Sequence, residues 1–190
     1  TKEDVPELND EFVKSVSETS KTVKEYKKEV KELLQKDAEL SYEYSVETAV
    51  WEKVMENTEV KKYPEKELKE TKENWIKQYQ TAAEYYQMEY ETFIEEQMGM
   101  TVEDFEKQIE TAVKDTIKEK MAVEAIADKE KIKLDDKTYK KELKNIVSDY
   151  GYESVDALKE AVEEKDLKKE VLKNVVIEKL AEKSIQVKSE

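Results

Sequence analysis

The stretch YYQMEYETFIEEQMGM, residues 85–100, places eight large apolar or aromatic side chains in sixteen positions of a chain in which 43% of residues are charged. Its large apolar and aromatic side chains are Tyr85, Tyr86, Met88, Tyr90, Phe93, Ile94, Met98 and Met100. On a helix, Tyr90, Phe93 and Ile94 fall within about 80° of Tyr86. The stretch therefore predicts an amphipathic helix whose stripe around Tyr86 is buried.

Four side chains of the same stretch do not fit that stripe. Tyr85 and Met88 lie roughly 100° and 160° away from Tyr86 around the helix. Met98 and Met100 flank Gly99, a residue typical of the end of a helix. Met adapts to partners of many shapes, and Tyr offers contact area with little entropy loss. We expect an adaptable apolar binding surface here, with burial under a third helix as the open alternative.

Outward from this stretch, apolar spacing predicts helices along the whole chain. The predicted ranges are 8–16, 22–57, 64–98, 101–131, 135–150, 154–162 and 166–184, after an extended lead and before a loose tail. The chain has only two Gly and two Pro, so it lacks the residues that the tight turns of a sheet need. Thr101 is a predicted N-cap, with Asp104 as a weak capping-box partner. The fold class expected from the sequence is all-α.

The longest predicted helix, 22–57, has an apolar stripe of its own, with alternating spacings of three and four residues. The stripe consists of Val23, Tyr26, Val30, Leu33, Leu40, Tyr44, Trp51 and Val54. Asp37 and Glu47 interrupt it. One interpretation is a helical scaffold or a coiled-coil homodimer with this stripe as its seam.

Composition argues against several classes of function. The chain has no His, Cys or Arg, which removes the commonest general base, thiolate chemistry and the bidentate fork for phosphate or guanine. Its net charge of −14 disfavours nucleic acids and anionic membrane surfaces. No apolar run approaches the ~20 residues of a membrane span. The opening TKEDVPELND has no signal-peptide pattern and no initial Met, so we expect a part of a longer protein.

Sequence motifs typical of metal, phosphate or catalytic sites are also absent from the sequence. The segment DKEKIKLDDK, residues 128–137, alternates acids but lacks the Gly and final Glu of a calcium loop. There is no Gly-rich phosphate loop, and runs of carboxylates are typical of solvated helix faces. We therefore expect no cofactor, no metal and no enzymatic activity.

Several segments resemble the C-terminal chaperone domain of bacterial trigger factor. The opening DVPELNDEFVKSV is similar to the exit from that family's prolyl-isomerase domain, and VWEKVMENTEVKKYPEKEL resembles its entry to the first helical arm. GMTVEDFEKQI and VKDTIKEKMAVEAIADKEKIKLDDK resemble the second helix of that arm and the turn after it. YKKELKNIVSDYG and LKKEVLKNVVIEKLAEKSIQV are similar to the second arm.

The resemblance implies an elongated all-α body with two helical arms that form a cradle for unfolded chains. It divides the chain into a lead and long body helix (1–63), a first arm (64–133), and a second arm with the C-terminal helix (134–190). The family's Arg-containing ribosome-docking motif and its isomerase domain are not in this sequence. Ribosome contact is therefore expected only through a domain outside this chain, and a cytoplasmic location is implied.

The leading hypothesis is an ATP-independent holdase that binds unfolded or nascent polypeptides. The client-binding residues expected are Tyr85, Met88, Met98, Met100, Met121, Val123, Ile126, Ile146, Tyr150 and Tyr152. Met121, Val123 and Ile126 are expected to face the cleft, and the last three to lie on the second arm. Besides the scaffold, the alternative is the helical chaperone part of an exported parvulin-type foldase.

Overall fold

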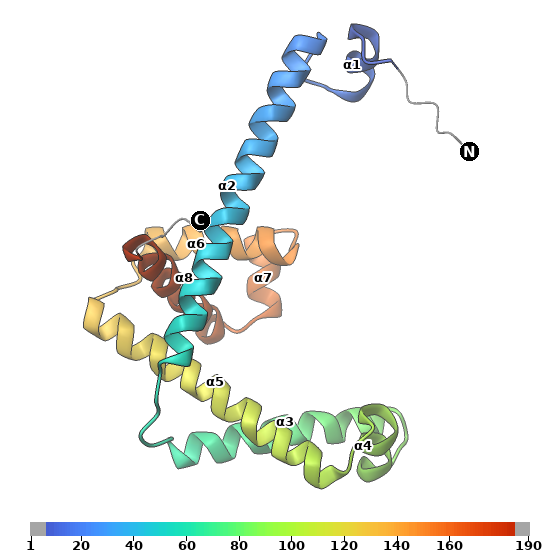
Figure 1. Cartoon of the computed structure of the whole chain (residues 1–190). Helices are drawn as coiled ribbons and strands as arrows, with labels where there is room; N and C mark the ends of the chain where they lie inside the picture. Colours follow the sequence, from blue (N-terminus) through green and yellow to red (C-terminus); the bar gives the residue numbers. More distant parts are fainter. Residues whose placement is uncertain (1–6, 185–190) are drawn as a thin grey trace, which may run out of the picture. The chain divides into compact units, whose positions relative to one another are not determined.

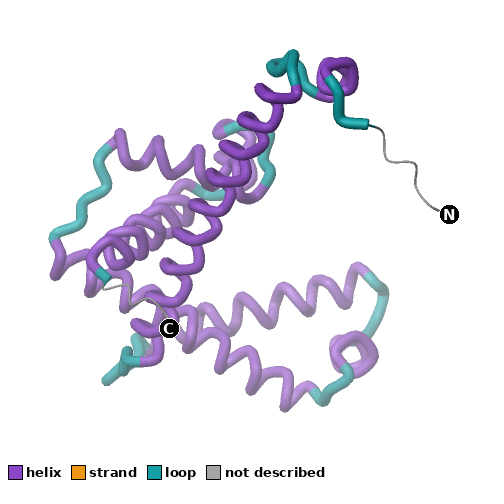
Figure 2. The backbone as a smooth tube through the Cα atoms, turned by 45° about the horizontal axis from the view of Figure 1, so that its top comes forward, coloured by secondary structure: helices purple, strands orange, loops and turns teal. Residues whose placement is uncertain are grey.

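The computed structural model describes residues 7–184 as eight α-helices, with no strand in that range (Figure 1, Figure 2). The predicted all-α class is confirmed. Most of the extended lead and the loose tail after Ser184 lie outside the described residues. The chain divides into two compact units, residues 1–49 and 50–190, which are described separately.

The first unit contains α1 (Asp10–Val16) and the N-terminal part of α2 (Val23–Glu56). A polar loop joins them. Glu29 on α2 accepts hydrogen bonds from the hydroxyls of Ser20 and, at 3.0 Å, Ser17. The hydroxyl of Ser20 contributes most to lowering the pKa of Glu29 below its usual value. The loop is therefore fastened to α2 by its own serines.

The second unit contains a helical hairpin with α3 (Glu65–Tyr85) and α5 (Val102–Glu130) as its long members (Figure 1). The short α4 (Tyr90–Met98) connects them at the end of the hairpin. The side chains buried between the three helices are Ala83, Phe93, Ile94, Phe105, Ile109, Val113 and Ile117. Phe105, Ile109, Val113 and Ile117, spaced four residues apart, thus form the buried stripe of α5 on this side.

The prediction of one helix over residues 64–98 is wrong, because the chain leaves the helix after Tyr85. Gln87 takes a left-handed conformation, with φ of +56°. The N–H of Met88 then donates to Ala83 O at 2.9 Å, and that of Gln87 to Glu84 O at 3.0 Å. This is the hydrogen-bond pattern of a Schellman C-cap, with Gln where Gly is usual. The break changes the direction of the chain before α4 begins.

Three more helices complete the second unit: α6 (Asp136–Tyr150), α7 (Val155–Ala161) and α8 (Glu164–Lys183). Their caps follow the sequence closely. Asp135 and Ser154 each accept a backbone N–H three residues ahead, and Gly151 ends α6 with φ of +70°. Thr101 caps α5 in the same way, and its hydroxyl donates to the Asp104 carboxylate at 2.9 Å.

α8 begins two residues before the predicted start at Asp166, with Glu163 as its N-cap residue. The core shared by α6, α7 and α8 consists of Leu143, Ile146, Leu158, Leu167, Val171 and Val175. A smaller cluster of Val123, Ala127 and Val176 joins α5 to α8. Trp51, at the end of α2 that belongs to this unit, packs against that cluster and donates from Nε1 to Glu119 at 3.0 Å.

Candidate functional site

Two aromatic side chains are exposed where α3 ends. Tyr85 is 81% exposed and Tyr86 is 63% exposed. Their ring centroids lie 5.4 Å apart in an edge-to-face arrangement, and the Tyr86 ring stacks on buried Phe93 with centroids 5.9 Å apart. Phe93 of the hairpin core therefore supports one face of the Tyr86 ring. Tyr85 packs against Tyr86, and most of the Tyr85 side chain is exposed to solvent.

Three methionines extend this apolar surface. Met98, 37% exposed, is the last residue of α4, next to the left-handed Gly99. Met88 and Met100 are half-buried against the hairpin core. We call the five residues Tyr85, Tyr86, Met88, Met98 and Met100 the tip surface. The alternative, in which a third helix covers all four off-stripe side chains, does not occur, because Tyr85 and Met98 are exposed.

Sequence reasoning missed Tyr86, which it assigned to the buried stripe together with Phe93 and Ile94. Those two residues are buried, whereas Tyr86 is mostly exposed. The helical-wheel angles assumed one continuous helix, and the break at Gln87 removes the fixed rotation between Tyr86 and α4. Only recognition of the Schellman turn could have corrected the assignment.

The second unit also contains an open hollow of about 1210 Å³, lined by α3, α5 and the start of α8. Its apolar contributors are few: Trp75, Ile117, Val123 and Leu172. Its charged contributors are Glu67, Glu70, Lys77, Glu119, Lys120, Glu124, Glu163, Lys165, Asp166, Lys169, Glu170 and Lys173. With seven acids and five lysines among its lining residues, the hollow carries a slightly negative balance of charge.

Ion pairs hold the walls of this hollow in place. Lys120 on α5 donates to Glu67 on α3 at 2.7 Å, and this bond raises the pKa of Lys120. Lys173 on α8 lies 2.9 Å from Glu119, which also accepts from the Trp51 indole. Glu119 thus connects the end of α2, α5 and α8.

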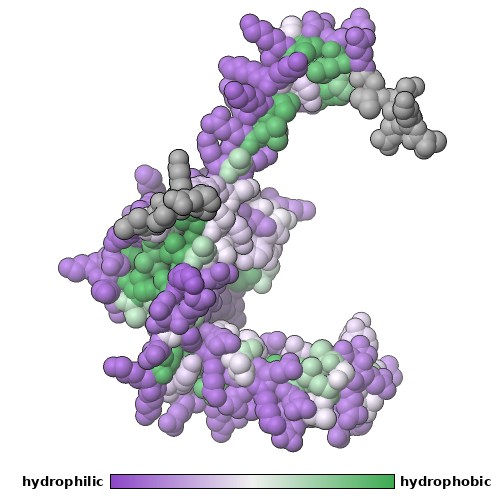
Figure 3. Space-filling model, in the orientation of Figure 1, coloured by the Kyte–Doolittle hydropathy of each residue, from purple (hydrophilic) through white to green (hydrophobic). Residues whose placement is uncertain are grey.

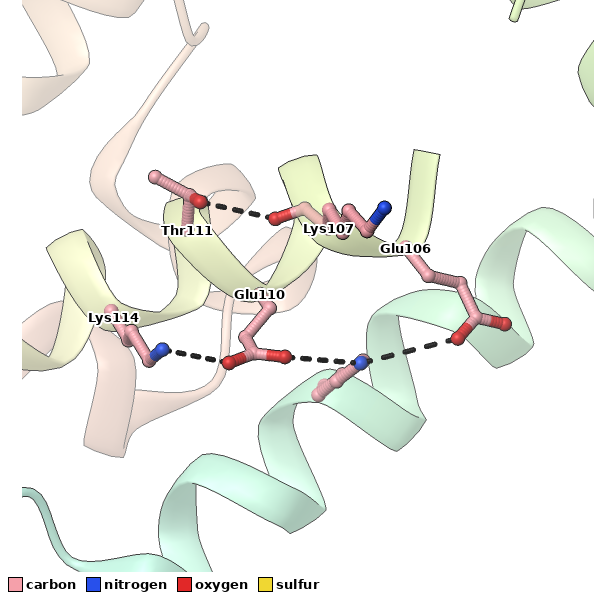
Figure 4. Close-up of polar contacts among 6 residues, drawn as sticks. Glu106, Lys107, Glu110, Thr111 and Lys114 are labelled. Atoms are coloured by element: carbon pink, nitrogen blue, oxygen red, sulfur yellow. Dashed lines mark hydrogen bonds and ion pairs between the residues drawn. The ribbon is translucent and has the colours of Figure 1, made fainter. Parts of the chain in front are cut away.

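A second set of charges links α3 to α5 nearer the tip (Figure 4). Lys72 on α3 lies 3.4 Å from Glu110 and 3.9 Å from Glu106, both on α5. Glu110 is also bonded to Lys114 at 2.7 Å, and the two lysines, Lys114 foremost, lower its pKa. These pairs fix the register of the two long helices, so the tip surface is presented on a defined support.

The three residues expected at the cleft lie in different places. Val123 contributes to the floor of the hollow, although only 5% of it is exposed. Met121 is half-buried and lines a separate recess of about 520 Å³ beside Tyr63 and Pro64. Ile126 packs against the small cluster between α5 and α8. The structure therefore does not bring these three together on one accessible surface.

On the second arm, one of the three predicted residues is exposed. Tyr150, the last residue of α6, is 68% exposed, and Tyr152 is half-buried against the core of α6–α8. Ile146, the third predicted residue, is 4% exposed in that core, so little of its side chain is accessible. Its place in the apolar stripe of α6 accounts for its burial.

The apolar stripe of α2 is largely uncovered. In the first unit, its members Leu33, Leu40 and Tyr44 are exposed, while Tyr26 and Val30 are half-buried. Figure 3 shows apolar side chains along part of α2 between hydrophilic ones. Such a row needs a partner or a functional reason, because apolar patches are seldom left open on soluble proteins.

Among residues 7–184, no group of His, Cys, Asp and Glu side chains is arranged to hold a metal ion. Within the same range, none of the helices combines the length and the apolar character needed to cross a bilayer.

Comparison with known proteins agrees with the helical arrangement. The chain matches the family model described as "Bacterial trigger factor protein (TF) C-terminus" over residues 22–186. The trigger factor of Limosilactobacillus reuteri is 25% identical over 186 residues, which is 98% of this chain and 42% of that protein. That of Caldicellulosiruptor bescii is 26% identical over 164 residues, or 86% of this chain and 36% of that protein.

The trigger factor of Streptococcus mutans is 24% identical over 151 residues, or 80% of this chain and 35% of that protein. The chain thus spans about two fifths or less of the length of these relatives. No solved structure matches it significantly. Since the family model covers every helix from α2 to α8, the chain belongs to the bacterial trigger factor C-terminal family.

Proposed function

We propose that this chain is an ATP-independent chaperone domain, a holdase, that binds apolar segments of unfolded or nascent polypeptides. The observation that carries the proposal is the pair Tyr85 and Tyr86, held in water at the end of a well-packed hairpin. Membership of the trigger factor family supports the same function.

The tip surface suits weak binding to many different sequences. Tyr and Met make apolar contacts without demanding a particular hydrogen-bond partner. Each contact of ~50 Å² is worth about 1 kcal/mol at ~25 cal/mol per Å², so several contacts must act together. Release then needs no nucleotide, because every single contact is easily broken.

Additional client contacts are proposed on the hollow and on α6. Trp75 and Val123 offer a small apolar floor in the hollow, and Tyr150 offers an exposed ring on α6. Met121, Ile126 and Tyr152 are partly covered, so we place them second. Ile146 is left out of the proposed contact set because of its burial.

The remaining partners follow from the family and the charge. We propose a cytoplasmic location and ribosome contact only through a domain outside this chain. Nucleic acids and anionic membranes are disfavoured by the net charge of −14. The family match favours this reading over the helical part of an exported foldase.

The direct test is suppression of aggregation. A chemically denatured client is diluted into buffer with near-stoichiometric amounts of the chain, and light scattering is followed with and without ATP. We expect scattering to fall equally in both conditions. Unchanged scattering at a several-fold excess of the chain would rule out the holdase function.

Matched substitutions locate the binding surface. Tyr85→Glu and Met98→Glu should each weaken client binding roughly five- to tenfold, because about 1 kcal/mol of apolar contact is lost. Tyr42→Glu is the control, since Tyr42 is 56% exposed on α2 and lies outside both the tip surface and the apolar stripe of α2. Circular dichroism verifies that each variant keeps its helices. Equal binding by all three folded variants would show that clients bind elsewhere.

A further inference from the structure

One face of α3 presents a row of neutral polar side chains to the hollow of the second unit. The row consists of Thr71, Asn74, Gln78 and Thr81, all of which line the hollow, and we call it the polar row. Steps of three, four and three residues place its members within about 80° of each other around the helix. On the basis of the proposed holdase function, we infer that the polar row binds the main chain of an extended client segment.

The four side chains are not committed to other parts of the protein. Among residues 7–184, none of them makes a hydrogen bond or an ion pair. A threonine inside a helix can bond back to a carbonyl one turn earlier, as Thr116 does to Ala112 O at 2.9 Å. Thr71 and Thr81 do not make that bond, so their hydroxyls are available to a ligand.

The charged side chains of the hollow are, in contrast, mostly paired with each other. Eight of the twelve form four close pairs, so their charges are largely compensated within the walls. Most of the polar lining side chains that still lack a partner therefore belong to the polar row. The four pairs, with N–O distances from 2.6 to 2.9 Å, are Glu67–Lys120, Glu119–Lys173, Glu163–Lys165 and Asp166–Lys169.

The dimensions of the polar row suit an extended peptide. From Thr71 to Thr81 it is about 15 Å long at ~1.5 Å per residue, the length of about four to five extended residues at ~3.3 Å each. Asn74 and Gln78 are about 6 Å apart along the axis, close to the ~6.6 Å after which an extended strand presents the same edge again. Successive carboxamides can therefore meet successive exposed peptide groups.

The chemistry of the polar row suits the main chain rather than a particular side chain. A carboxamide has both donors and an acceptor, so Asn74 or Gln78 can bond the N–H and the C=O of a peptide group together. Such bonds are the same for every client sequence. In a folded protein most main-chain groups are already bonded, so the polar row should favour unfolded clients. Half-buried Trp75 lies beside the row in the lining and offers an apolar contact to a client side chain.

Peptides that differ only in the main chain test this recognition. A labelled Ser-rich peptide of roughly ten residues with a few leucines is compared with its fully N-methylated form, which has no main-chain N–H, by fluorescence anisotropy. We expect the full chain to bind the unmethylated peptide about tenfold more tightly. The variant N74A/Q78A should weaken the unmethylated peptide about tenfold and the methylated one less than twofold, so that the preference disappears.

Two further variants serve as controls. Gln80→Ala changes an exposed carboxamide of α3 that does not line the hollow, so the preference should stay as in the wild type. Tyr85→Glu should weaken both peptides by the same factor, because the tip surface makes side-chain contacts. Alanine favours the helical state, and circular dichroism verifies that each variant is folded.

The outcomes separate this inference from the holdase function. An N74A/Q78A variant that keeps the wild-type preference, or a wild type without any preference, would overturn recognition of the main chain by the polar row. Aggregation of a denatured client is measured with the same chains. If the wild type suppresses aggregation but does not distinguish the two peptides, the holdase function stands and only the role of the polar row is wrong.

Discussion

At the scale of single residues, Gln87 is the position where local conformation most affects the site. Its φ of +56° belongs to the left-handed region, which costs a non-Gly residue about 1 kcal/mol. The strain persists because Met88 N–H and Ala83 O close the turn and Phe93 and Ile94 bury α4 behind it. The turn is what exposes Tyr86.

Gln87→Gly should therefore stabilise the protein by about 0.5 kcal/mol, since relief of strain outweighs the extra entropy of Gly in the unfolded chain. Gln87→Val should destabilise it by about 1–2 kcal/mol, because a β-branched side chain is disfavoured in the left-handed region. Urea unfolding followed by circular dichroism measures both. The idea fails if the two substitutions shift the free energy of unfolding in the same direction.

At the scale of elements, predictability followed the strength of local signals. The ends of α5, α6 and α7 were predictable because Thr101, Asp135, Ser154 and Gly151 are strong cap residues. The end of α3 was not, because Gln87 carries no such signal and the apolar spacing continues past it. The burial of Ile146 and the exposure of Tyr86 were not predictable for a related reason: periodicity identifies a face, but tertiary packing decides whether it is covered.

The docking of α4 can be tested as an element. Ile94 is fully buried between α3 and α5, so Ile94→Ala should cost about 2–5 kcal/mol through lost contacts and a cavity. Hydrogen exchange of the α4 amides should accelerate accordingly. Glu95→Ala, one residue along on the exposed side of α4, should change stability by less than about 0.5 kcal/mol. Similar effects of the two substitutions would mean that α4 is not anchored by Ile94.

At the scale of the whole molecule, the second unit has two kinds of surface that differ in charge. The tip surface is apolar and independent of charge, whereas the hollow is lined by seven acids and five lysines in a chain of net charge −14. Composition predicted the acidic balance but not this division, since only the fold places Glu67, Glu119 and Glu170 around one space. Under the proposed function, the affinity for an unfolded peptide should therefore depend on the charge of the peptide as well as on its apolar residues.

The prediction concerns two unfolded peptides with the same apolar residues, one carrying lysines and the other glutamates at the remaining positions. The lysine peptide should bind several-fold more tightly at about 0.05 M salt, where charges act over ~14 Å, and the advantage should shrink at about 0.5 M, where they act over ~4 Å. Fluorescence anisotropy measures both affinities. Tyr85→Glu should weaken both peptides at high salt, because the apolar contribution is what remains there. Equal affinities at low salt would show that the acidic lining of the hollow takes no part in binding.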